Sequence, residues 1–119
     1  MRNPTSAKAK GRGWQKDVKE AILKTFPELE QDDVRSTPIG VNGEDIQLSP
    51  AARKVLKGIQ IECKRVKAIG RVYEWMDQAK EHGPYMPVVF ARADHKEAIV
   101  ILPMDYFLKL KRCEYEAGL

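Results

Sequence analysis

The segment at residues 59–64 (IQIECK) constrains the fold more than any other part of the chain. Apolar and polar residues alternate along it, which is the pattern of a β-strand with one face toward a core. Ile59, Ile61 and Cys63 are expected on one side of this strand. Gln60, Glu62 and Lys64 are expected on the other, so the Glu62 carboxylate and the Lys64 ammonium leave the same face.

The remaining predicted elements surround this strand. In chain order they are a helix at residues 14–26 stopped by Pro27, short strands near Val34 and at 46–48, a helix at 50–56 capped by Ser49, a helix at 72–80, two strands at 87–92 and 98–102, and a last helix after Pro103. The polar turn at residues 93–96 indicates that the two later strands form an antiparallel hairpin as central strands of the sheet. The sequence therefore predicts a mixed α/β domain with helices packed on a central sheet.

The chain of 119 residues has the length of one domain. Residues 1–12 (MRNPTSAKAKGR) are polar and basic, so we expect a flexible arm there and a single domain over residues 13–119. No apolar run approaches the roughly 18 residues that a membrane span needs. Two widely spaced cysteines, Cys63 and Cys113, indicate neither a disulfide scaffold nor a zinc site, which favours a reducing cytoplasm.

The net charge is +4 and is unevenly distributed. Residues 1–24 and 53–71 are basic, and the stretch between them is acidic. Two basic segments around an acidic one suit a surface that grips a polyanion near a metal-binding pocket, although a solvated surface of mixed charge is the alternative. The candidate phosphate contacts are Lys8, Lys10, Arg12, Arg65, Lys67 and Arg71.

Asp45, Glu62 and Lys64 form the candidate catalytic group. Asp45 follows a glycine-rich turn (VNGEDI), and two carboxylates that converge on one point bind a hard divalent cation such as Mg²⁺. Such a cation polarises phosphate oxygens and activates bound water, and an adjacent ammonium can hold the phosphate. The alternative is an edge strand with a solvated charged face.

This arrangement resembles the PD-(D/E)xK, or restriction-endonuclease-like, nuclease superfamily, and in particular its Holliday junction resolvases of archaeal and phage type. The resemblance rests on Gln15 in the first helix (GRGWQKDV), Asp45 in GEDI, and Glu62 with Lys64 in IECK. Two departures are that Glu44, not proline, precedes Asp45, and that Gln15 stands where the resolvase pattern has an acid. Glu44 is therefore a second-ranked candidate ligand.

The resemblance implies a restriction-endonuclease-like core with a central mixed sheet flanked by helices. It implies that Asp45, Glu62 and the backbone carbonyl of Cys63 bind Mg²⁺, for which Mn²⁺ can substitute, while Lys64 and Gln15 assist catalysis. The expected function is DNA cleavage by a homodimer at four-way junctions, in the cytoplasm of a prokaryotic or phage-infected cell. The alternatives are a phage or restriction-type nuclease acting on linear duplex DNA or its ends, and a non-catalytic basic DNA-binding module.

Overall fold

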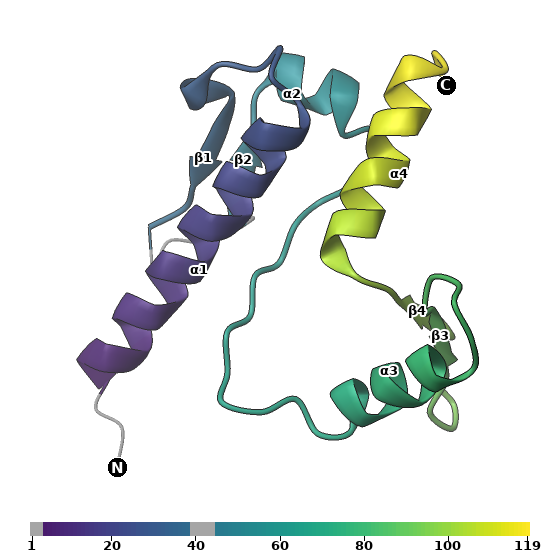
Figure 1. Cartoon of the computed structure of the whole chain (residues 1–119). Coiled ribbons are helices and arrows are strands. Elements are labelled where there is room, and N and C mark those ends of the chain that lie inside the picture. The colour runs from purple at the N-terminus through teal and green to yellow at the C-terminus, as the bar shows by residue number, and fades with distance from the viewer. Residues whose placement is uncertain (1–3, 39–44) are drawn as a thin grey trace. The chain divides into compact units, whose positions relative to one another are not determined.

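The computed structural model describes residues 4–38 and 45–119, and the side chains of residues 4–8 are outside that description. The described residues form a mixed α/β structure with four α-helices and two separate two-stranded antiparallel sheets (Figure 1). None of the helices in these ranges is long and apolar enough to cross a membrane.

Contacts within the chain divide it into two compact units. Unit 1 comprises Met1–Arg65 and Leu108–Leu119, and unit 2 comprises Val66–Phe107. All residues of the candidate catalytic group belong to unit 1. The single domain expected over residues 13–119 remains a prediction.

The first helix, α1 (Pro4–Thr25), begins earlier than the sequence analysis predicted. Residues 4–12 are thus helical, while the expectation that residues 1–12 form a flexible arm stays a prediction. Proline suits the first turn of a helix, and the alanines and lysines that follow favour helix formation without an apolar stripe to reveal it. The end of α1, just before Pro27, matches the prediction.

The sheet of unit 1 pairs β1 (Val34–Ser36) with β2 (Ile46–Leu48), with Val34 opposite Leu48. A short 3-10 helix, η1 (Gln31–Asp33), leads into β1, and α2 (Pro50–Val55) follows β2. Ser49 caps α2 as predicted, because its hydroxyl accepts a hydrogen bond from the Ala52 N–H (3.1 Å). The same hydroxyl donates to Asp33 (2.7 Å), which ties the start of α2 to η1.

The core of unit 1 lies where α1 packs on β1. Its fully buried large side chains are Phe26, Ile22, Ile46, Leu56 and Val34. The C-terminal part of α4 (Met104–Glu116) joins this core through Tyr115, whose ring meets Phe26 edge to face at 6.4 Å between ring centroids. Unit 1 therefore has a packed interior that fixes the elements carrying the candidate site.

Unit 2 consists mainly of α3 (Val72–Glu81) packed on a hairpin of β3 (Val89–Ala91) and β4 (Ile99–Ile101). The antiparallel pairing confirms the predicted hairpin. The two strands are not central, however, because they form a sheet of their own and Phe90 is 84% exposed. The apolar, β-branched residues of the two strands led us to expect buried side chains, but many side chains of the hairpin are exposed.

Residues 59–64 form extended chain with one isolated bridge, between Ile61 and Ile46, and not the regular strand that was predicted. The alternation of exposure is nevertheless as expected: Ile59, Ile61 and Cys63 are half-buried, and their neighbours are exposed. The pattern thus predicted the direction of the side chains, while the ladder of hydrogen bonds depends on partner strands elsewhere in the chain. Among the described residues no larger sheet is formed around this segment.

Candidate active site

Asp45 is held through its backbone at the start of β2. Its N–H donates to the Ile61 carbonyl (3.2 Å), and its carbonyl accepts from the Thr37 N–H (2.9 Å). These bonds extend the β1–β2 pairing by one residue and bring the 59–64 segment alongside. Asp45 is therefore fixed between two neighbouring stretches of chain.

The Asp45 carboxylate contacts the same segment. Its Oδ2 accepts a hydrogen bond from the Cys63 N–H at 2.6 Å, a short, charge-assisted bond. Among the residues that the structure describes, no donor binds Oδ1. One oxygen thus anchors the carboxylate next to the IECK sequence.

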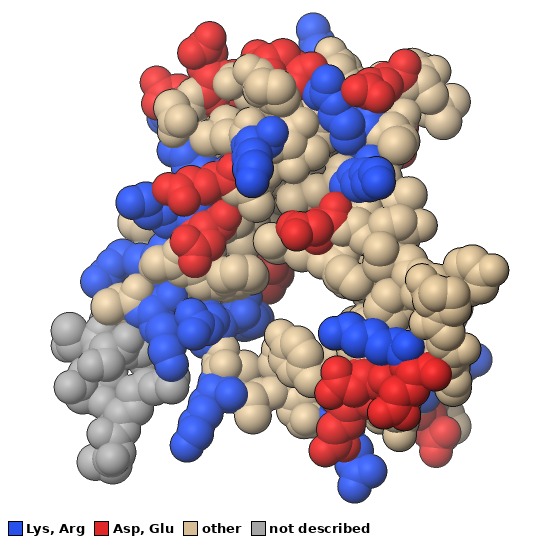
Figure 2. All heavy atoms as spheres, in the orientation of Figure 1, with Lys and Arg blue, Asp and Glu red and all other residues tan. Residues whose placement is uncertain are grey.

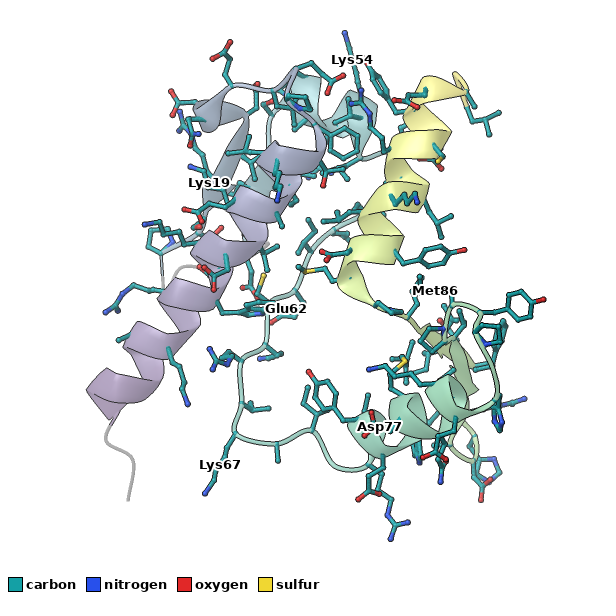
Figure 3. All side chains as sticks on the ribbon, in the orientation of Figure 1. Lys19, Lys54, Glu62, Lys67, Asp77 and Met86 are labelled. Carbon is teal, nitrogen blue, oxygen red and sulfur yellow. The ribbon has the colours of Figure 1, made fainter. Side chains whose placement is uncertain are left out.

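Glu62 and Lys64 leave the same side of the extended segment, as the alternation predicted. The Lys64 Nζ lies 3.4 Å from Glu62 Oε1, and the two side chains are 75% and 65% exposed, respectively. Figure 3 labels Glu62 on this segment. An ion pair this exposed contributes little to stability, on the order of 0–1 kcal/mol.

The pKa of the Cys63 thiol is affected by both carboxylates. Its pKa is raised from 9.0 to about 11, first by burial and then by the negative charges of Asp45 and Glu62. Both charges must lie near the sulfur to disfavour the thiolate. Asp45 lies near the thiol because its carboxylate accepts the hydrogen bond from the Cys63 N–H, and Glu62 because it is the preceding residue in the chain. The convergence of the two carboxylates on one cation stays a prediction.

Gln15 lies in α1 and is only 6% exposed. It is seven residues, or about two turns, before Ile22, so it continues the face of α1 that packs on β1. No hydrogen bond of its side-chain amide is made within the described part of the chain. Leaving a buried amide without a partner costs about 1–3 kcal/mol.

The donor types at this site suit a hard divalent cation. Asp45 and Glu62 supply carboxylate oxygens and Cys63 supplies a backbone carbonyl, which are the ligand types that Mg²⁺ prefers. No three His, Cys, Asp or Glu side chains gather closely enough to hold a metal within residues 4–38 and 45–119. The second-ranked ligand, Glu44, lies outside the described residues.

The predicted DNA contacts are distributed over both units. In unit 1, Arg12 and Arg65 are exposed, Lys10 is half-buried, and the side chain of Lys8 lies outside the description. In unit 2, Lys67 and Arg71 are exposed, and Arg71 lies 4.0 Å from Glu74. Each unit thus has predicted DNA-contact residues exposed to solvent. Those of unit 1 belong to the same compact unit as the candidate catalytic group.

Two features were missed by sequence reasoning. The first is that Lys16 and Lys19 on α1 lie near Gln15. Their spacing of four and seven residues from Arg12 could have indicated that the three cations share one side of the helix. Unit 2 also has a cavity of about 450 Å³ between α3 and β3, lined by Trp75, Gln78, Ala79, His82 and residues 88–92. The sequence gives no signal for this cavity, which arises from how the hairpin packs on α3.

Comparison with models of known protein families, with curated proteins and with solved structures found no match for this chain.

Proposed function

We propose that this protein is a metal-dependent DNA endonuclease. The observation that carries the proposal is the position of the Asp45 carboxylate, which accepts a 2.6 Å hydrogen bond from the Cys63 N–H and so lies beside the segment that carries Glu62 and Lys64. A purely solvated charged face does not require Asp45 to be anchored by three hydrogen bonds beside the IECK sequence.

The roles of the residues follow from their donors and acceptors. Asp45, Glu62 and the Cys63 carbonyl would hold Mg²⁺ or Mn²⁺, which polarises a phosphate oxygen and activates bound water. The Lys64 ammonium can hold a phosphate oxygen and stabilise the charge that develops there. The Gln15 amide can donate a hydrogen bond to the phosphate or to the attacking water, which would satisfy its buried N–H groups.

The proposed substrate is a four-way DNA junction, cut by a homodimer as the resemblance to Holliday junction resolvases implies. A symmetric dimer presents two equal sites, so it can engage two strands of a junction at once. The restriction-endonuclease-like core with a central mixed sheet is part of the same proposal. Its support is the mixed α/β composition and the side-chain direction along the IECK segment.

The test is a cleavage assay on a labelled four-way junction and on a linear duplex of the same sequence, each with and without Mg²⁺. The wild-type chain should introduce paired, symmetric nicks near the branch point only with Mg²⁺, and Glu62→Gln should abolish them. Glu81→Gln, an exposed acid on α3, is the control and should cleave like wild type.

Three results would change the proposal. Equal cleavage of duplex and junction by a monomer would leave a nuclease for linear DNA. Binding without Mg²⁺-dependent cleavage would leave a DNA-binding module. Full activity of Glu62→Gln would remove this site from the reaction.

A further inference from the structure

We propose that one side of α1, formed by Arg12, Lys16 and Lys19, binds successive phosphates of the DNA strand held at the candidate active site. We call these three residues the basic stripe. The inference rests on the proposed function and assigns the strand-binding surface of the same site.

The spacing of the basic stripe follows from helix geometry. Arg12 and Lys16 are four residues apart and Lys16 and Lys19 three, so all three lie on one side of α1. Gln15 is three residues after Arg12 and four before Lys19, which places it directly next to both on the helix surface. Because Gln15 is buried on the face of α1 that packs on β1, the basic stripe borders that face, with Arg12 and Lys16 exposed and Lys19 half-buried.

The length of the basic stripe suits a DNA backbone. With a rise of about 1.5 Å per residue, Arg12 and Lys19 are roughly 10 Å apart along the helix axis. One strand of B-DNA carries a phosphate about every 3.4 Å of its axis, so that distance spans roughly three phosphates. Three cations therefore face about three negative charges.

The charges of the basic stripe are not neutralised within the described chain. Arg12 and Lys19 have no carboxylate within ion-pair distance among these residues. Lys16 meets Glu20 only at 4.0 Å, with both side chains largely exposed, so water screens the pair. Figure 2 shows several Lys and Arg side chains, with Asp and Glu among them, on the side where α1 lies, and Figure 3 labels Lys19 on this helix.

Two other lysines of α1, Lys10 and Lys24, do not belong to the basic stripe. Lys10 is five residues before Gln15 and lies on the other flank of α1, so it is not part of the basic stripe. Lys24 is nine residues after Gln15, about two and a half turns, and is exposed on the opposite side. Lys24 is thus a matched control on the same helix.

The experiment measures DNA binding as a function of salt in the Glu62→Gln background, where the proposed cleavage is blocked. The triple variant Arg12→Gln, Lys16→Gln, Lys19→Gln is compared with Lys24→Gln on a four-way junction and on duplex DNA. Each lost phosphate contact should reduce the slope of log K against log salt by about 0.9 on duplex DNA, so the triple variant should lose about 2.7. Lys24→Gln should leave the slope unchanged.

Helicity by circular dichroism and urea unfolding confirm that each variant is folded. Arg12→Gln alone, which should reduce the slope by about 0.9, serves if the triple variant is destabilised. An equal slope for the stripe variants and Lys24→Gln overturns the inference. Cleavage by the otherwise wild-type chain, measured in parallel, separates the two proposals. Mg²⁺-dependent cleavage with an unchanged slope rejects the basic stripe alone, whereas stripe-dependent binding without cleavage rejects the endonuclease and keeps the DNA surface.

Discussion

Replacing Asp45 separates its structural role from its proposed chemical one. The Asp45 carboxylate accepts a 2.6 Å hydrogen bond from the Cys63 N–H, and bonds to a charged group contribute about 1.5–3 kcal/mol. Asp45→Asn keeps a carbonyl oxygen in the same place and should retain a neutral bond of about 1 kcal/mol. The Asn variant should therefore lose about 1 kcal/mol of stability. Asp45→Ala leaves the N–H without its acceptor and should lose about 1–3 kcal/mol.

Catalysis should follow a different order. Both variants remove the negative charge that would bind the cation, so both should lose Mg²⁺-dependent cleavage to a similar extent. Loss of an outer-shell partner costs roughly 10–100-fold in activity, and loss of a direct ligand should exceed that. The Asn variant should thus be nearly as stable as wild type and almost inactive.

Urea unfolding and single-turnover cleavage of a labelled junction, on the same protein samples, measure the two effects. The midpoints should rank wild type above Asn above Ala, while both variants fall to the same low rate. Cleavage by Asp45→Asn within tenfold of wild type would show that the carboxylate only anchors Cys63. The reasoning about a cation site would then be wrong.

Three further results are expected. Lys64→Ala should reduce single-turnover cleavage by roughly 10²-fold or more while leaving the Mg²⁺ dependence unchanged, since an ammonium stabilises charge but does not bind cations; unchanged kinetics would refute that role. Hydrogen bonds hold the pKa of Asp33 below its ordinary 3.8, so this carboxylate stabilises the fold at neutral pH and that contribution is lost as pH falls through its folded pKa. Asp33→Asn should therefore make urea unfolding less sensitive to acidification below pH 3.8, and equal sensitivity would count against it. In a Cys113→Ser background without metal, Asp45→Asn should lower the Cys63 pKa from about 11, measured as alkylation rate against pH, but burial should keep it above 9.0; an unshifted profile would mean that the charge of Asp45 does not act on the thiol.

The features that the sequence predicted correctly are those encoded by neighbouring residues. Ser49 and Pro50 specify the start of α2 because a hydroxyl cap and a fixed proline φ act within one turn. Pro27 marks the end of α1, and a polar turn between two β-branched runs specifies the hairpin of unit 2. Each signal is complete within a few residues, so no information about distant contacts is required.

The features that escaped prediction depend on contacts between distant residues. Alternation along residues 59–64 defines which side chains share a side, but within the described part of the chain only Ile61 of this segment has a strand partner, in β2. The apolar character of residues 87–92 likewise indicates β structure without saying how many strands will pair with it. In the candidate site, the common direction of Glu62 and Lys64 follows from local pattern. The burial of Gln15 does not, because it depends on α1 packing on β1.

The different restraints on the two carboxylates support a site that is open to a ligand. Asp45 is fixed by two backbone hydrogen bonds and one to its side chain, so one of its oxygens has a defined position before any ligand arrives. Glu62 is exposed and, among the described residues, forms an ion pair with Lys64, an interaction of about 0–1 kcal/mol. A cation that engages Glu62 would release the Lys64 ammonium, which then stays beside the site as a donor for phosphate. Because this ion pair is weak, it does not oppose the binding that the proposed function requires.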